Sequence, residues 1–283
     1  MGLLRPPGET LTREDRLKLV LAPGRYDTAL FERLDKRRKA KDDFLALVPE
    51  TGQTAEEFAR EEKDKLPPHR RAIRFFPYTD GENAPTAALL GALARFAEAV
   101  FPGAGGEIGP LRPLGPEFFD EAGERVEADA VLDDLLDFVG VDVLAAIALA
   151  NAALFSGPRE VVGGLASFRR RVAVMSIPFQ ADGADDELFL RRMLGAVAHD
   201  VGHVLGMAHC VFFRCVMNGA ATDEALDDRP ILFCPVCEEK IGIALGVADA
   251  ARLDSRKKLR AFCREFGLVA EAKHLEKRLK LGE

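Results

Sequence analysis

The chain has 283 residues, of which 48% are apolar and 30% are charged, and this balance is typical of a globular protein rather than a disordered or fibrous one. Its formal charge of −7, from 46 acidic and 39 basic residues, provides no overall field that would collect nucleic acid or an anionic membrane. We therefore expect no nucleic-acid partner and no membrane partner.

The apolar segments also argue against a membrane protein. The longest run, 143–154, is interrupted by Asn151 and is shorter than the roughly 18 residues that a membrane span requires, so it is expected to form a buried helix. Residues 1–16 mix charged residues and prolines without the apolar centre of a secretory signal. These features, together with cysteines spaced like metal ligands, predict a reducing cytoplasm as the compartment.

Residues 1–70 are expected to form a helical N-terminal extension. Thr12 and Asp27 are candidate N-caps, and Thr54 with Glu57 makes a capping-box pattern. The two prolines at 67 and 68 end this region.

Residues 71–240 are expected to form the main domain, of mixed α/β (α+β) class with a small twisted sheet, because strand and helix patterns alternate through its middle. The expected elements are, in order, a strand at 72–78, a helix at 87–101, a glycine-rich loop at 103–109, helices at 128–139 and 141–155, and a buried strand at 172–176.

A further helix is predicted from Glu187 to Leu205, because apolar residues recur along it at helical spacing. His199 and His203 lie on its other face, one turn apart, so their rings can converge on one zinc ion at bond lengths of roughly 2.0–2.1 Å. An isolated pair of this kind is more often two surface histidines. A third histidine, His209, makes a metal site the favoured interpretation.

His209 reaches the same ion only if the helix ends before it, because six further helical residues would rotate it by about 600°. Gly206 is suited to end the helix, since glycine adopts a left-handed conformation at little cost. Three neutral imidazoles with one open position are typical of a catalytic zinc site.

Four cysteines follow closely and predict a second, structural zinc site. They are Cys210, Cys215, Cys234 and Cys237. A mixed site that joins His209 to Cys210 is the less favoured alternative, because neighbouring side chains in an extended segment point to opposite faces. Buried cysteines without metal are the other alternative. Cys263 stands apart on an apolar helical face and is expected in the core.

The segment 199–237 resembles the archaemetzincins, a family of metzincin-type zinc metallopeptidases, whose pattern is HExxHxxGxxHC, four residues, Cys, one residue, Met, a loop and CxxC. A weaker likeness extends back to about Ala72, so that 1–70 and 241–283 are flanking helical extensions. The resemblance implies a metzincin-like domain with an active-site helix, two zinc ions per chain, and Met217 as an apolar floor beneath the catalytic zinc.

One position departs from the family pattern, because Asp200 replaces the glutamate that acts as general base on the zinc-bound water. Aspartate has the same chemistry, but its carboxylate is withdrawn by roughly 1 Å, a misplacement that can cost about 10²-fold in rate. Alternatively, Asp200 is a solvated helix residue without a role.

We therefore expect a zinc metallopeptidase in which Asp200 is the base and a peptide substrate lies along an edge strand near 161–176. The alternative is a weak or inactive homologue that captures peptides as a binding or scaffold protein. A cysteine knuckle that binds nucleic acid is disfavoured by the acidic balance. In 254–283, where Ser255 is a candidate cap and Gly267 a candidate helix end, the basic residues are expected to be a solvated face, with an acidic partner or membrane surface as the alternative.

Overall fold

The computed structural model describes residues 11–36, 44–61, 67, 69–82, 84–157, 161–167 and 170–281. Its centre is a sheet with the strand order β2-β1-β5-β9-β8, and β3 pairs with the far end of β1. The strands are β1 (Ala72–Thr79), β2 (Gly105–Ile108), β3 (Arg112–Pro113), β5 (Val143–Ala150), β8 (Gly164–Ser167) and β9 (Val172–Ser176). All neighbours are parallel except β8, which runs antiparallel to β9 and forms one edge.

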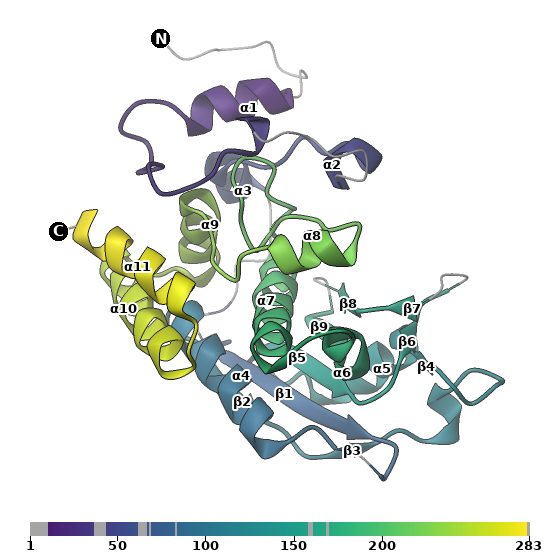
Figure 1. Ribbon diagram of the computed structural model, residues 1–283. Helices are drawn as coiled ribbons and strands as arrows, with labels where there is room; N and C mark the ends of the chain where they lie inside the picture. Colours follow the sequence, from purple (N-terminus) through teal and green to yellow (C-terminus); the bar gives the residue numbers. More distant parts are fainter. Residues whose placement is uncertain are drawn as a thin grey trace.

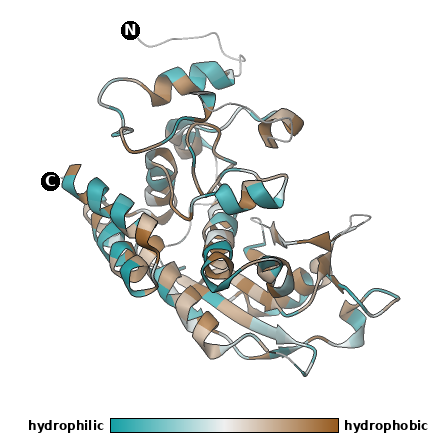
Figure 2. Cartoon of the chain, viewed as in Figure 1, coloured by the Kyte–Doolittle hydropathy of each residue, from teal (hydrophilic) through white to brown (hydrophobic). Residues whose placement is uncertain are grey.

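Helices cover both faces of this sheet, which confirms the mixed α/β class. The helices α4 (Ala87–Val100) and α7 (Asp186–Val204) pack on one face, where Phe75, Ile147 and Met175 are buried. Helix α5 (Ala128–Leu135), continued by a 3-10 turn (Leu136–Phe138), packs on the other face. Figure 1 shows α7 standing across the sheet, and Figure 2 shows apolar residues concentrated where these helices and strands meet.

The prediction of a buried helix over 141–155 is wrong. These residues form β5, the central strand, whose eight residues are all buried, followed by a turn and the short strand β6 (Leu154–Phe155). A strand covered on both faces reads as a continuous apolar run, and periodicity cannot separate such a strand from a buried helix. The alanines of this run favour a helix locally, and sheet pairing with β1 and β9 overrides that preference.

The prediction of a loop over 103–109 is also wrong in part, because β2 forms there and pairs in parallel with β1. One of its two glycines permits close packing: a Cβ atom on Gly106 would lie 2.0 Å from the carbonyl oxygen of Ala94 in α4. The glycine therefore permits α4 to approach the sheet edge.

A second, three-stranded sheet, β4-β6-β7, lies beside the main one. Its other strands are β4 (Val126–Glu127) and β7 (Val161–Val162), and a 3-10 turn at Pro116–Phe118 precedes it. Two short helices border the region around α7, namely α6 (Ile177–Ala181) and α8 (Asp223–Asp228). Figure 1 shows the small sheet at the right of the molecule and α8 above it.

The N-terminal extension is less helical than predicted. It contains α1 (Arg13–Val20), a 3-10 turn (Leu34–Lys36), α2 (Phe44–Leu47) and α3 (Ala55–Arg60), joined by turns. Thr12 and Thr54 cap α1 and α3 as expected, each with a complete capping box. Asp27 caps no helix; its carboxylate accepts a hydrogen bond from the Ala29 amide in a turn. The parts of this prediction at 1–10, 37–43 and 62–66 lie outside the described residues.

Three helices complete the chain: α9 (Pro235–Leu245), α10 (Asp249–Glu265) and α11 (Val269–Leu281). Gly267, with φ of 74°, follows the end of α10 as predicted, and Cys263 is buried in the core. Ser255 does not begin a helix. It lies within α10, where its hydroxyl donates to the Ala99 carbonyl. Arg256 and Arg278 both bind the buried carboxylate of Glu238, so part of the basic charge is spent inside the molecule.

Among the helices in the described part of the chain, none combines the length and the apolar character needed to cross a membrane.

The close approach of α4 to β2 yields a test of this topology. Gly106→Ala is expected to lower the free energy of unfolding by about 1–3 kcal/mol, because the added methyl group overlaps the α4 backbone. Gly105→Ala is the matched control, since a Cβ there meets nothing within 4 Å. Urea denaturation of both variants measures the difference, and equal stabilities would contradict the close packing.

Candidate metal centre

Helix α7 carries His199 and His203. It begins at the N-cap Asp185, whose side chain accepts from the Leu188 amide, and one face is buried against the sheet. The two imidazoles lie on the other face, with their ring centroids 4.5 Å apart. The predicted helix therefore forms almost at its expected bounds.

The helix ends where the sequence indicates. Gly206 has φ of 85°, the left-handed region in which L side chains are strained, and its amide donates to the His203 carbonyl at 2.8 Å. The chain then turns back, so that the His209 ring lies 5.3 Å from the His199 ring and 4.9 Å from the His203 ring, measured between centroids. One ligand atom from each histidine lies within 4.8 Å of the other two.

Each histidine is held at Nδ1. The Nδ1 atoms of His199 and His203 lie 2.8 and 2.9 Å from the carbonyl oxygens of Val216 and Met207. Since a carbonyl oxygen only accepts, a proton on each Nδ1 satisfies these two contacts and leaves the Nε2 lone pairs free. The third ring is held by a carboxylate: His209 Nδ1 lies 2.9 Å from Glu50 Oε1. All three Nε2 atoms are thus available to a metal.

The donor set fits zinc. The Nε2 atoms of His199 and His203 are 3.0 Å apart, and two tetrahedral bonds of roughly 2.0–2.1 Å place nitrogens about 3.3 Å apart. Burial lowers the pKa of His199 well below its usual value, and burial together with the charge of His209 lowers the pKa of His203 to about 4. Both rings are therefore neutral at pH 7, as ligation requires.

The four cysteines are also brought together. All are buried and unpaired by disulfides, and their sulfur atoms lie within 4.8 Å of one another. Cys210 Sγ and Cys234 Sγ are 3.7 Å apart, close to the roughly 3.8 Å between two sulfurs that bind one zinc at about 2.3 Å. Hydrogen bonds from the other three thiols lower the pKa of Cys210, so a thiolate is favoured in the cluster. The histidine and cysteine groups are separate, which disfavours a mixed site.

Met217 lies beneath the histidine helix. It is fully buried, and a Cβ atom on Gly202 would approach its Sδ to 2.3 Å. Gly202, between the two helical histidines, therefore admits Met217 against α7. The Met217 carbonyl also accepts from the Cys210 amide at 2.8 Å, which links the turn to the segment after His209.

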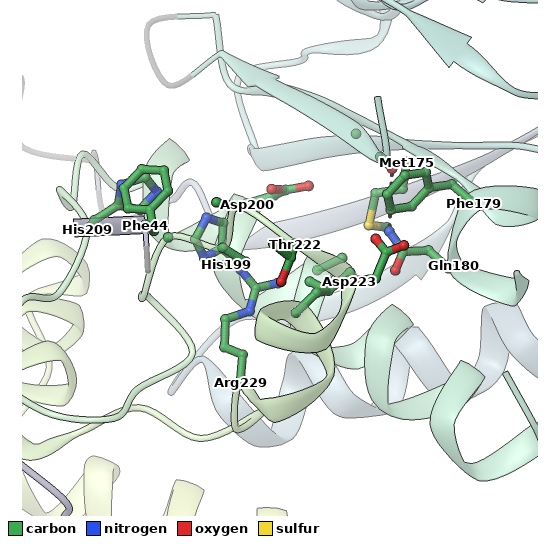
Figure 3. Close-up of a pocket in the computed structure, with 17 residues that line it drawn as sticks. Phe44, Met175, Phe179, Gln180, His199, Asp200, His209, Thr222, Asp223 and Arg229 are labelled. Carbon is green, nitrogen blue, oxygen red and sulfur yellow. Dashed lines mark hydrogen bonds between the residues drawn. The ribbon is translucent and has the colours of Figure 1, made fainter. Parts of the chain in front are cut away.

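A cavity of about 340 Å³ opens beside the histidines. Its lining includes Gly163 and Gly164 from the sheet edge, Asp200 and Arg229. In Figure 3, His199 points toward His209, whereas the Asp200 carboxylate extends to the other side of His199, into the space in front of Met175 and Phe179. Burial raises the pKa of Asp200 to about 7, and the charge of Arg229 opposes this rise.

Sequence reasoning missed three residues of this site. Arg229 lies with a guanidinium nitrogen 3.1 Å from His199 Nδ1, and Phe44 packs edge-on against His209 at 5.1 Å between ring centroids. Glu50 holds His209, as described above. Phe44 and Glu50 come from the N-terminal extension, about 160 positions before His209, and carry no local motif that would mark them.

Part of the chain resembles a known family of peptidases. Residues 125–242 match the model of peptidase family M54. Archaemetzincin from Thermococcus kodakarensis is 34% identical over 103 residues, which are 35% of this chain and 55% of that protein. Human archaemetzincin-2 is 34% identical over 65 residues, which are 23% of this chain and 18% of that protein. The chain thus aligns with about half or less of the length of these relatives.

The fold agrees with this comparison. The crystal structure of archaemetzincin from Methanopyrus kandleri superposes with a TM-score of 0.54 at 22% identity, covering 63% of this chain and 97% of that one. In the present chain, three histidines are grouped on and after the helix α7. Residues 125–242 are thus similar in sequence to peptidase family M54.

The glycine at the end of α7 yields a second test. Gly206→Ala is expected to destabilise the protein by about 1–2 kcal/mol, because alanine is strained in the left-handed region. Gly195→Ala, in the same helix, is the matched control: its Cβ would meet one side-chain atom at 3.7 Å, an ordinary contact. This control is expected to stabilise the helix by about 0.5–1 kcal/mol. Thermal unfolding followed by circular dichroism measures both, and a neutral Gly206→Ala would contradict the assigned turn.

Proposed function

We propose that the protein is a zinc-dependent metallopeptidase, with His199, His203 and His209 as ligands of a catalytic zinc ion. The observation that carries the proposal is the convergence of three imidazoles, each held at Nδ1, on one point beside a cavity. When bound, zinc would supply a Lewis acid that activates water and polarises the scissile carbonyl. The M54 match supports peptide bonds as the substrate.

Asp200 is the proposed general base. It directly follows the first histidine and lines the same cavity as His199 and His209. Its carboxylate would take a proton from the attacking water and return it to the leaving amine. Because aspartate is one methylene shorter than glutamate, we expect a slow enzyme rather than a fast one.

The substrate would bind as an extended strand beside β8. This strand is the edge of the main sheet, with no further strand paired to it among the described residues, and Gly163 and Gly164 line the cavity at its start. Main-chain hydrogen bonds to a free sheet edge are a common way to bind an extended peptide. This arrangement would carry a peptide from the sheet edge past Asp200.

The cysteine group is proposed to hold a second, structural zinc ion with Cys210, Cys215, Cys234 and Cys237 as ligands. Four buried sulfurs at tetrahedral spacing support this proposal. The site joins the segment after His209 to the start of α9, so metal binding there would contribute folding free energy to the region around the catalytic centre. Thiolates that bind zinc must stay reduced, which favours the cytoplasm as the compartment.

We also propose the division into an extension (1–70), a peptidase domain (71–240) and a C-terminal extension (241–283). Residues 125–242 support the middle part as the functional unit. Peptides or proteins are the proposed partners, and the acidic balance of the chain argues against nucleic acid and membranes.

Asp200 also favours a second candidate function. A homologue whose base is too short would retain the zinc site and the cavity and would capture peptides without cleaving them. Such a protein would act as a zinc-held binding or scaffold protein.

Metal analysis tests the two sites. The wild-type protein is expected to contain two zinc ions per chain, His203→Ala one, and Cys237→Ser one or none together with reduced stability, because the structural site is tied to folding. Elemental analysis of the purified proteins measures the counts. A single zinc ion in the wild type that is unaffected by His203→Ala would remove the catalytic site.

Peptide cleavage separates the two candidate functions. If the protein is an enzyme, we expect the wild type to cleave peptides and His203→Ala to be inactive. In Asp200→Asn the rate is expected to fall by about 10²–10⁴-fold, because the base is lost. Asp200→Glu is expected to accelerate cleavage by up to about 10²-fold. A peptide library with mass-spectrometric detection measures all four proteins. Cleavage by Asp200→Glu alone would identify an inactive homologue, and equal rates in wild type and Asp200→Asn would remove Asp200 from the mechanism.

A further inference from the structure

The N-terminal extension reaches the metal centre through Glu50, whose carboxylate contacts His209. Glu50 lies between α2 and α3, and its Oε1 is 2.9 Å from His209 Nδ1. The two residues are 159 positions apart, and Glu50 lies outside the segment that matches the M54 model. The third histidine therefore depends on a part of the chain that the family pattern does not include.

Of the three histidines, His209 has the weakest local support. His199 and His203 project from a regular helix, and each is held by a backbone carbonyl near α7. His209 lies in irregular chain beyond Gly206, and its Nδ1 contacts a carboxylate. A carboxylate at this position fixes the ring orientation and makes Nε2 a stronger donor to a metal.

The extension also braces the segment on which His209 lies. Gln53 Oε1 accepts from the Ala208 amide at 3.3 Å, directly before His209, and Phe44 packs against the His209 ring. Further hydrogen bonds continue along the same segment: Leu34 N to Phe212 O at 3.0 Å, Arg214 N to Glu32 O at 2.8 Å, and Arg13 Nη2 to Val211 O at 3.0 Å. This set of contacts places the extension along the whole connection between the histidine site and Cys215.

One oxygen of the Glu50 carboxylate lacks a partner in the described part of the chain. Its Oε2 is buried and has no hydrogen-bond partner among the described residues, although Oε1 contacts His209. A buried carboxylate oxygen without a hydrogen-bond partner is costly. A divalent cation bound to Nε2 of His209 would place positive charge on the other side of the ring, and this charge would stabilise the Glu50 carboxylate.

We propose that Glu50 is a positioning residue of the metal centre, and that docking of residues 44–61 and zinc binding at the three histidines are coupled. The extension would thus be a component of the zinc site rather than a cover added to a complete domain. By thermodynamic linkage, the extension raises zinc affinity by the same factor by which zinc stabilises the docked extension. The inference rests on the catalytic zinc site of the proposed function and does not depend on peptide cleavage.

Zinc affinity of full-length variants tests the first half of this coupling. Glu50→Ala is expected to weaken zinc binding at the histidine site by about 10–100-fold, the effect of losing a partner of a metal ligand. Glu50→Gln keeps the size of the side chain and an acceptor oxygen but loses the charge, and is expected to weaken binding by about tenfold. Competition between each protein, already loaded at the cysteine site, and a chromophoric chelator measures the second zinc ion.

The matched control is Glu56→Gln in α3 of the same extension. Glu56 pairs with Arg25, and its carboxylate is about half exposed. This control is expected to bind zinc like the wild type. Wild-type affinity in both Glu50 variants would overturn the inference, and so would an equal loss in the control, which would attribute the effect to the charge of the whole extension.

Hydrogen exchange tests the second half. Addition of Zn²⁺ to protein with only the cysteine site loaded is expected to slow amide exchange in residues 44–61 in the wild type, and to slow it less in Glu50→Gln. A merely structural Glu50 would give the same zinc response in both proteins, which would overturn the coupling. If the wild type binds no zinc at the histidines, both the proposed function and this inference are wrong. If it binds two zinc ions but amide exchange in residues 44–61 does not respond to zinc, only this inference is wrong.

Discussion

The arrangement of the metal centre depends on the point at which α7 ends. His199 and His203 share one face of a helix, and a third histidine joins them only if the chain reverses direction directly after that helix. Gly206, at φ of 85°, makes this reversal without strain, and its amide caps the helix. Cys210 directly follows His209 in the reversed segment, and its side chain belongs to the separate group of four sulfurs. Two separate groups of ligands thus follow from one change of backbone direction.

The sheet provides the rigid support against which this helix is held. The buried face of α7 packs on residues of β5 and β9, and Met217 fills the space that Gly202 leaves open. His199 and His203 therefore stand on an element that is fixed by apolar burial. The cavity lies beside them, next to β8, which has only β9 as a strand partner among the described residues.

Burial sets the electrostatics of the centre. The low polarity around His199 and His203 keeps both rings neutral, and the same environment raises the pKa of Asp200 to about 7, against the charge of Arg229. Both effects follow from loss of hydration, which penalises whichever form carries charge. His209 differs because a carboxylate from the N-terminal extension stands behind it. The surroundings of the third ligand thus include a distant part of the chain.

The sequence by itself determined the features that rest on local spacing: the helix with His199 and His203, the turn at Gly206, the caps at Thr12 and Thr54, and the grouping of the cysteines. These features follow from backbone periodicity and from the conformational freedom of single residues. Tertiary structure decided the rest. The apolar run at 143–150 became a strand because sheet partners pair with it on both sides, and the segment with Gly105 and Gly106 became a strand because it pairs with β1. Glu50 and Phe44 reached His209 only through folding of a segment about 160 residues away, a proximity that no local pattern encodes.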